Sequence, residues 1–386
     1  MSRKIAVGID VGTYQIKVVV AEQNPKDQRA TIIGTGFAQS RGIRHGYVVS
    51  KQDIGRMLHS AVQQAEKASG IAVRRAYVSV GGVGLEEFRS RAEILVSRAD
   101  NEVTDLDLKN VIEESERKIS SRLINRKIIH AIPLAYKLDG ERLMGSPIGM
   151  KGTKLEIDSL FITALEQHLN DLIAAVEEAG ISVTDVMASP LAGSFVTLTK
   201  AQKIAGVVLA NIGAETISVA VFENEVPISV KVFPVGSTDI THDIALGLKI
   251  SIDDAEQAKM GALVNSVTSK KQLDTIITRR LSDIFQVVEA HLKRIGKNGL
   301  LPAGIVISGG GSGIATIEDI AKVVLKIPSK KASFTVNTKS KVKNSTWAVA
   351  YGLCIWGLTN TNESSNFSTI KENASGLFSW LKQFLP

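Results

Sequence analysis

The chain contains a single cysteine, Cys354, so an internal disulfide is excluded and a reducing compartment is favoured. Its six histidines are scattered, without the spacing of metal ligands. No run approaches the roughly 18 consecutive apolar residues of a membrane-spanning helix. A strand pattern begins at Ile5, so we expect no secretory signal. Aromatic residues make up only 5% of the chain and are not interleaved with basic ones, so nucleic acid is not an expected partner.

The remaining composition is typical of a globular protein. Hydrophobic residues make up 44% of the 386 residues, and the mean hydropathy is +0.10. This length is enough for about two or three domains with sizeable cores. The formal net charge of +7 favours acidic partners, such as a nucleotide, an anionic lipid or an acidic protein segment.

Residues 5–17 predict a β-hairpin that can hold a phosphate group and a metal ion. Gly12 lets the backbone approach a bound group closely. Backbone N–H groups and the Thr13 hydroxyl can donate hydrogen bonds to a phosphate. Asp10 ends a buried strand and can hold a hydrated Mg²⁺, while Lys17 can supply a compact positive charge. The alternative is an ordinary hairpin with a capping aspartate.

Two later segments repeat or complete this pattern. Residues 206–221 again form a buried strand, a small polar turn and a second strand. Residues 304–312 form a buried strand that ends in glycines, and a helix is expected over residues 314–325. A strand–glycine–helix junction suits a nucleotide packed on backbone. The three segments together therefore predict a nucleotide-binding site.

This combination resembles the actin-like ATPase superfamily. The resemblance implies a first phosphate loop at residues 10–17, a second at 211–218, an adenosine loop at 309–311, and ATP with Mg²⁺ as ligands. The implied nucleotide-binding residues are Asp10, Gly12, Thr13, Tyr14, Lys17, Asn211, Gly213, Ala214, Glu215, Thr216, Gly236, Glu256, Lys259, Gly309, Gly310, Gly311 and Ser312. Asp10 and Asn211 would hold the metal through water, Asn211 weakly because an amide brings no charge.

Glu256 and Lys259 resemble the acid–lysine pair that lies against the nucleotide ribose in this superfamily. They are three residues apart, so they share one face of a helix. The alternative is a plain surface ion pair.

Residues 81–165 are more charged and predict a small α+β insertion. A strand pattern over 91–98 precedes a helix from Thr104, two short segments at 127–133 and 136–140, and a strand over 155–164. His130 is expected to be a core histidine, because nothing nearby completes a catalytic set. If the insertion is a separate unit, deletion of residues 84–162 should preserve nucleotide binding.

This insertion resembles the 1C subdomain of the bacterial cell-division protein family FtsA. The segments that carry the resemblance are residues 130–133, Asp139, 147–150 and 154–157 within the insertion, and 42–46, 189–192, 235–236 and 240–245 outside it. The resemblance runs from residue 4 to about 358. It implies an α/β, actin-like, two-lobed fold, built from duplicated ribonuclease H-like domains with an inserted 1C subdomain.

The expected subdomains follow from this fold. Their bounds are 1–80 with 166–196 for 1A, 81–165 for 1C, 197–235 with 296–358 for 2A, and 236–295 for 2B. A polar, flexible linker is expected at 359–374, followed by an amphipathic membrane-targeting helix at 375–386. Its apolar face would contain Leu377, Phe378, Trp380, Leu381, Phe384 and Leu385. Docking of this helix on its own domain is the alternative.

The resemblance to FtsA implies a protein that polymerises, binds the C-terminal tail of the tubulin-like FtsZ and tethers the division ring to the cytoplasmic membrane. Other division proteins would bind through 1C. The nucleotide would act mainly as an assembly ligand, with at most slow hydrolysis. Ser189 stands where many relatives place an acid or amide, and Asn211 and Ser218 replace two aspartates. We therefore assign no catalytic residue.

Two alternatives remain at this point. A pilus-assembly protein of the PilM type is a related binding module, but it normally lacks a tethering tail helix. A sugar kinase of the same superfamily needs an acid to accept the proton of the substrate hydroxyl. No acid is convincingly placed beside the two hairpins.

Overall fold

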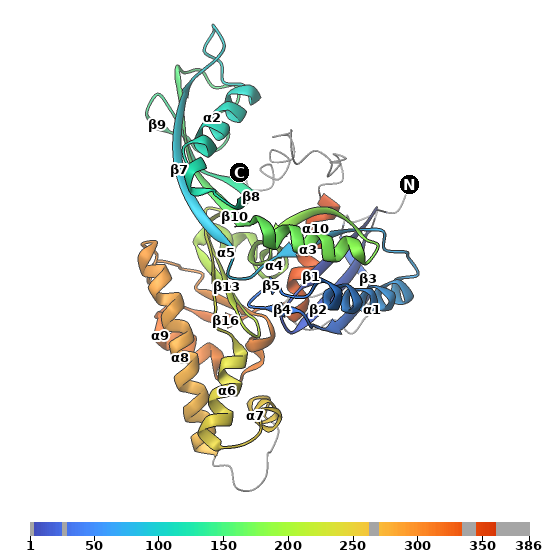
Figure 1. Ribbon diagram of the computed structural model, residues 1–386. Coiled ribbons are helices and arrows are strands. Elements are labelled where there is room, and N and C mark those ends of the chain that lie inside the picture. The colour runs from blue at the N-terminus through green and yellow to red at the C-terminus, as the bar shows by residue number, and fades with distance from the viewer. Residues whose placement is uncertain (1–3, 25–28, 262–269, 334–344, 360–386) are drawn as a thin grey trace.

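The computed structural model describes residues 4–24, 29–261, 270–333 and 345–359. Figure 1 shows two lobes side by side and a third part that projects from them. Each lobe is built on a five-stranded sheet, and the projecting part has a four-stranded sheet of its own. The linker and the membrane-targeting helix expected beyond residue 359 lie outside the described residues.

The sheet of the first lobe has the order β11-β6-β1-β2-β3. Its strands are β1 (Lys4–Val11), β2 (Gln15–Gln23), β3 (Ala30–Gln39), β6 (Arg75–Val80) and β11 (Ser182–Ala188). Helices α1 (Lys51–Ser69) and α3 (Glu166–Glu178) cover it. A small hairpin of β4 (Ile43–Arg44) and β5 (Tyr47–Val48) precedes α1.

The sheet of the second lobe has the order β14-β13-β12-β15-β16. Its strands are β12 (Val207–Ile212), β13 (Ile217–Glu223), β14 (Val226–Phe233), β15 (Ile305–Ser308) and β16 (Ser329–Lys331). Its helices are α5 (Lys200–Ala205), α6 (Ser237–Leu248), α7 (Ile252–Lys259), α8 (Lys270–Arg294) and α9 (Ile317–Leu325). Helix α4 (Ser189–Thr197) lies between the two sheets, and α10 (Ala348–Thr359) packs against β1, β2 and β6 of the first lobe.

The two five-stranded sheets share one topology. In each lobe an antiparallel hairpin, β1–β2 or β12–β13, has a parallel strand beside its first strand, β6 or β15. Asp10 pairs with Lys17 two positions before the turn of the first hairpin, and Asn211 pairs with Ser218 at the same place in the second. The duplication expected from the two hairpins is therefore present in the fold.

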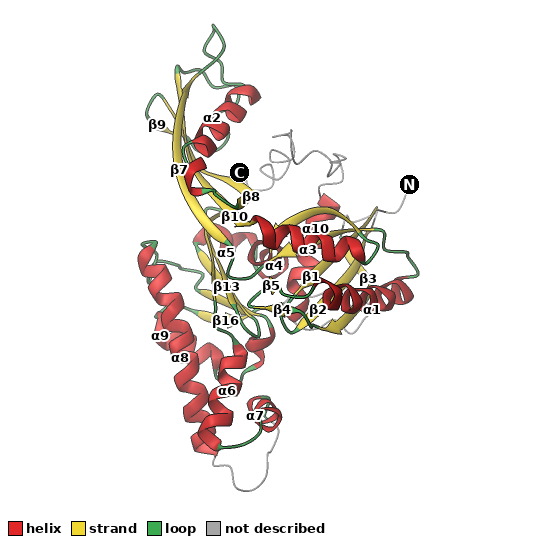
Figure 2. Ribbon diagram, in the orientation of Figure 1, coloured by secondary structure: helices red, strands yellow, loops and turns green. Residues whose placement is uncertain are grey.

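Two glycines bring α10 close to its neighbours. A Cβ on Gly8 in β1 would fall on the carbonyl of Ala350, and one on Gly352 would fall on the carbonyl of Ala192 in α4. Helix α10 thus packs against backbone of both β1 and α4, where no larger side chain fits. This packing joins the two lobes at their centre (Figure 2).

The projecting part is inserted between β6 and α3. It contains β7 (Glu86–Leu95), α2 (Asp105–Arg117), β8 (Arg126–Leu138), β9 (Glu141–Arg142) and β10 (Lys154–Leu165), with sheet order β7-β10-β8-β9. The Thr104 hydroxyl accepts from the Asp107 backbone N–H, and the Asp107 carboxylate accepts from the Thr104 N–H. This reciprocal pair fixes the start of α2 where the sequence predicts it.

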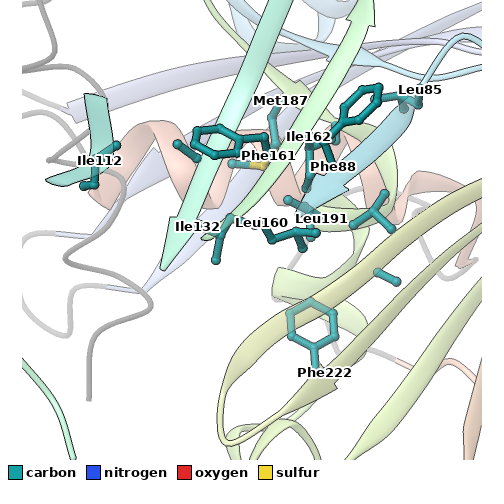
Figure 3. Packing of buried hydrophobic residues seen from close by; sticks show 14 of the residues in the cluster. Leu85, Phe88, Ile112, Ile132, Leu160, Phe161, Ile162, Met187, Leu191 and Phe222 are labelled. Atoms are coloured by element: carbon teal, nitrogen blue, oxygen red, sulfur yellow. The ribbon is translucent and has the colours of Figure 1, made fainter. Parts of the chain in front are cut away.

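The core of the insertion continues into both lobes. Figure 3 shows Phe161 and Ile132 of the insertion in one cluster with Met187 of β11 and Leu191 of α4. Phe222 of β13 belongs to the same cluster. All five side chains are fully buried. The inserted subdomain is thus packed onto the body of the protein and is not an isolated unit.

Short 3₁₀ turns, at Ser120–Arg122, Gly310–Gly313 and Ser345–Trp347, complete the secondary structure of the described residues. In this part of the chain no helix is both long and apolar enough to span a bilayer.

Candidate functional site

The first hairpin turns through residues 12–14. The Gly12 N–H donates to the Gln15 carbonyl (3.2 Å), while Ser40 donates its N–H to the Tyr14 carbonyl (2.9 Å) and its hydroxyl to the Gly12 carbonyl (2.5 Å). Ser40, which follows the last residue of β3, therefore stabilises this turn. The sequence did not reveal that role. The Tyr14 side chain is exposed at the tip, and Thr13 lies beside it.

Asp10 lies at the end of β1 beside two polar partners. The Ser79 hydroxyl on β6 donates to Asp10 Oδ1 (2.8 Å), and Lys17 faces Asp10 across the hairpin. Burial raises the pKa of Asp10, and the Lys17 charge and the Ser79 hydrogen bond partly oppose it. Burial likewise lowers the pKa of Lys17, which the Asp10 charge opposes. A cation bound next to Asp10 would favour the ionised carboxylate.

The second hairpin has the same turn as the first. Gly213 N–H donates to the Thr216 carbonyl (2.8 Å), as Gly12 does to Gln15. The first turn of α6 packs against this loop, because Ser237 N–H donates to the Gly213 carbonyl and Thr238 N–H to the Ala214 carbonyl (both 2.9 Å). A Cβ on Gly236 would collide with the backbone of Ala214.

The glycine loop after β15 lies against the second hairpin. Gly309 has a left-handed backbone, with φ of 84°, and a Cβ there would fall on Asn211 Oδ1 and the Ile212 carbonyl. A Cβ on Gly311 would meet the Ile212 side chain, whereas one on Gly310 would have no atom within 4 Å. Gly310 therefore forms the open side of this loop.

The Ser312 hydroxyl is engaged inside the protein. It is buried, donates to the Gly309 carbonyl (2.7 Å) and lies 3.1 Å from the Ser345 hydroxyl. It supports the shape of the glycine loop.

Glu256 and Lys259 form an ion pair of 2.6 Å on α7, and the Lys259 side chain is only 5% exposed. Lys259 also donates to Thr241 Oγ1 (2.8 Å) and to the Ser237 carbonyl (3.2 Å). Thr241 in turn donates to Glu256 Oε2 (2.6 Å). The Glu256 side chain, in contrast, is 49% exposed. The contact with Ser237 places the pair beside the first turn of α6, which packs against the second hairpin.

Glu215 extends from the second hairpin toward the first lobe. Its Oε2 accepts from the His45 backbone N–H (2.6 Å), and Arg44 lies 3.9 Å from Oε1. The Glu215 carbonyl oxygen also lies 3.2 Å from the His45 ring Nδ1, so both its carboxylate and its carbonyl contact the first lobe. The candidate residues of the second lobe thus form one group, which is linked through residues 44 and 45 to the first lobe, where residues 10–17 lie.

His130 confirms the expectation of a core histidine. It is 3% exposed, and its Nε2 accepts from the Ala188 backbone N–H (3.0 Å). Burial lowers the pKa of His130 to about 3, so the ring is neutral. Ser189, which follows Ala188 in the sequence, is the first residue of α4. It is also buried and lies next to Gly81.

The chain fits Mg²⁺ only as a largely hydrated ion. Among the described residues, no group of three or more His, Cys, Asp or Glu side chains is arranged to hold a metal. Mg²⁺ in nucleotide sites usually keeps several waters and binds one or two carboxylates together with phosphate oxygens. The partly buried carboxylate of Asp10 fits that pattern.

Two family models match the chain. One, described as cell division protein FtsA, matches residues 208–352, and the other, an SHS2 domain inserted in FtsA, matches residues 82–163. The FtsA protein of Borreliella burgdorferi is 30% identical over 352 residues, which cover 86% of this chain and 84% of that protein. The chain belongs to the FtsA family of cell-division proteins. The resemblance inferred from the insertion is thereby confirmed, and the pilus-assembly and sugar-kinase alternatives are set aside.

Other FtsA relatives cover as much of the chain. FtsA of Bacillus subtilis is 29% identical over 353 residues, covering 86% of this chain and 79% of that protein. FtsA of Pseudomonas aeruginosa is 26% identical over 390 residues, covering 95% and 92%.

Solved structures confirm the actin-like fold. The PilM–PilN type IV pilus biogenesis complex aligns with a TM-score of 0.69 and 17% identity, covering 92% of this chain and 98% of that one. MreB5 of Spiroplasma citri bound to ADP aligns with a TM-score of 0.51 and 13% identity, covering 92% and 96%. At these identities the likeness concerns the fold alone.

Proposed function

We propose that this FtsA-family chain is a nucleotide-dependent actin homologue that polymerises on the cytoplasmic membrane and links the FtsZ ring to it at the division site. Family membership supports the role in cell division. The observation that carries the nucleotide part is the duplicated hairpin, with Asp10 opposite Lys17 and Asn211 opposite Ser218. Solved neighbours of the same fold include MreB5 bound to ADP and to AMPPNP.

ATP would lie between the two hairpins. Backbone N–H groups of residues 12–14 and 213–216 would donate to its phosphates, Gly309–Gly311 would face the base, and Glu256 with Lys259 would face the ribose. Asp10 would hold Mg²⁺ through water, and bound Mg²⁺ would neutralise phosphate charge. Lys17 would add a cation on the same side. The ligand would favour one arrangement of the lobes by binding it more tightly than the other.

The subdomain division into 1A, 1C, 2A and 2B is part of this proposal, with FtsZ tail binding on the second lobe. The proposed function as a whole is tested by co-sedimentation of the protein with lipid vesicles, with and without Mg-ATP and FtsZ. We expect FtsZ to pellet with vesicles only when the chain is present. Failure of FtsZ to pellet with chain and vesicles would refute the linking role.

Hydrolysis is expected to be slow. Asn211 and Ser218 face each other where a carboxylate would orient a metal-bound water, and Ser189 is a poor base. Loss of a general base costs about 10²–10⁴-fold in rate. Steady-state phosphate release should therefore fall well below the roughly 1–100 per second of typical kinases. Release within that range would contradict this expectation.

Membrane binding is assigned to the helix expected over residues 375–386, which lies outside the described residues. Leu381→Glu would place a charge among the six apolar residues of its predicted face. A single short tail binds lipid weakly, so stable attachment needs many tails linked in a polymer. Leu381→Glu should release the protein from vesicles while Mg-ATP binding is kept. Equal pelleting of variant and parent would remove the tail from the tether.

Self-association is assigned to the distal end of the inserted subdomain. Leu95, Met144, Ile148 and Met150 expose 42% or more of their surface there. Two backbone hydrogen bonds join the segment 96–103 to the segment 150–153: the Val96 N–H donates to the Thr153 carbonyl, and the Val103 N–H donates to the Met150 carbonyl. An ordered, exposed apolar surface of this kind is typical of an interaction site.

Met144→Glu is expected to raise the concentration needed for filaments on lipid by about tenfold or more, because an unpaired polar group buried at a contact costs roughly 1–3 kcal/mol. Its stability should stay within about 0.5 kcal/mol of the parent, since Met144 is fully exposed. Val323→Glu on α9, where Val323 is 75% exposed, is the matched control. Unchanged filaments for Met144→Glu in electron microscopy would exclude this surface.

A further inference from the structure

His45 lies where three parts of the protein meet. Its backbone N–H donates to Glu215 Oε2 (2.6 Å), and its ring Nδ1 lies 3.2 Å from the Glu215 carbonyl oxygen. Its own carbonyl accepts from the N–H of Val83, at the start of the inserted subdomain (3.2 Å). One residue of the first lobe therefore contacts both the second hairpin and the beginning of the insertion.

The His45 side chain is exposed, but the backbone that follows it is tightly packed. Gly46 and Gly82 pack backbone against backbone, because a Cβ on either would collide with the other. Tyr47 on the same hairpin stacks edge-on against His168 of α3, with ring centroids 5.2 Å apart. A shift of Glu215 would therefore be passed to Gly82 and Val83 rather than absorbed by the hairpin.

The insertion is also bonded to the second lobe further along β7. Glu87 accepts from the Ser229 hydroxyl (2.9 Å) and from the Val230 N–H (2.6 Å), and Arg89 donates to the Ile228 carbonyl (2.8 Å). Chain connectivity places the insertion in the first lobe, yet these hydrogen bonds attach it to the edge strand of the second. Its orientation thus depends on how the two lobes are arranged.

We propose that His45 is a positioning residue that couples the nucleotide site to the orientation of the inserted subdomain, through Glu215 on one side and Val83 on the other. This inference rests on the proposed binding of nucleotide. Phosphate held by residues 213–216 would fix Glu215, and Glu215 would fix His45 and Val83. Coupling between two binding events is reciprocal. Nucleotide would therefore strengthen the filament contacts of the insertion by some factor, and those contacts would raise nucleotide affinity by that same factor.

The test compares hydrogen exchange of the Val83 amide with and without saturating Mg-ATP, alongside nucleotide affinity in the same samples. In the parent, Mg-ATP is expected to slow this exchange by about fivefold or more. Glu215→Ala removes the acceptor of the His45 N–H and should abolish the slowing. Glu215→Gln keeps one acceptor oxygen and should restore part of it. Arg44→Ala is the matched control, because Arg44 is 76% exposed and 3.9 Å away.

A second variant addresses the coupling from the opposite side. Gly46→Ala pushes on Gly82 and changes none of the predicted nucleotide-binding residues. It is expected to change Mg-ATP affinity by about fivefold or more. If the parent does not bind Mg-ATP, the proposed function fails. If the parent binds, equal slowing in Glu215→Ala and parent, or an unchanged affinity of folded Gly46→Ala, overturns the coupling alone.

Discussion

Asp10→Ala is expected to weaken Mg-ATP binding by about 10–100-fold, the usual loss when a residue that orients the coordination of a metal is removed. The Asp10 carboxylate lies partly buried at the end of β1, where Ser79 orients it and Lys17 lies opposite. Burial favours the neutral form of the Asp10 carboxyl group, and a cation bound in the site would stabilise the ionised form. Its position beside the turn at residues 12–14 would bring that cation next to the phosphates of the proposed ligand.

Calorimetry with Mg-ATP measures this loss, and Asp10→Asn separates charge from packing. The amide oxygen of Asn can still accept from Ser79 and fills the same space, so Asp10→Asn keeps the packing and this hydrogen bond, whereas both variants remove the charge opposite Lys17. With metal removed by EDTA, parent and Asp10→Asn should bind nucleotide alike, because the carboxylate acts through Mg²⁺. Equal Mg-ATP affinity of Asp10→Ala and parent would show that the site is assigned to the wrong residues.

The parts of the fold that could be predicted from the sequence are those set by local chemistry. The helix expected after Ser50 is present, with the Ser50 hydroxyl accepting from the Asp53 N–H and Gly70 ending it in a left-handed conformation. Both hairpins are present because two apolar runs flank a small turn in each. Such signals depend only on a few neighbouring residues, so they can be recognised in the sequence alone.

The residues that the sequence did not reveal depend on contacts between distant segments. Ser79 lies 69 residues from Asp10, and His45 lies 170 residues from Glu215. No pattern along the chain connects such pairs. A signal did exist for Ser79, because Ser308 holds the matching place in the second lobe, where it pairs with Asn211. Comparison of the two halves after their alignment on the hairpins would have suggested it.

The insertion differs from its predicted pattern in the bounds of its strands and in its core. The strand expected over 91–98 lies at Glu86–Leu95, as β7. The segments expected at 127–133 and 136–140 fall on one strand, β8, which passes through Pro133 and ends at Leu138. The register shifts next to the residue opposite Pro133, Ser159, since proline has no N–H for the ladder.

The second difference is the shared core. Because Phe161 packs in one cluster with Met187 and Leu191, deletion of residues 84–162 would expose apolar surface of the body. Preserved nucleotide binding after that deletion is therefore no longer expected, and surface variants such as Met144→Glu are the better test.

Gly309→Ala and Gly310→Ala are expected to fail in different ways. At Gly309 the combination of φ 84° and ψ 179° is one that glycine adopts almost exclusively, which costs an alanine about 1–3 kcal/mol. Its methyl group would also overlap Asn211 and the Ile212 carbonyl, and overpacking of this kind adds about 1–3 kcal/mol. Gly309→Ala should therefore lower the free energy of unfolding by about 2–6 kcal/mol.

At Gly310 an alanine methyl has no atom of the protein within 4 Å, so stability should stay within about 0.5 kcal/mol of the parent. If the nucleotide base packs on this open side of the loop, the same methyl group would occupy its place and weaken Mg-ATP binding by about tenfold or more, which is a loss of about 1.4 kcal/mol. Denaturant unfolding and calorimetry on both variants, with Gly313→Ala as a second exposed glycine with open space, separate the two effects. A folded Gly310→Ala that binds Mg-ATP as tightly as the parent would place the base away from the glycine loop.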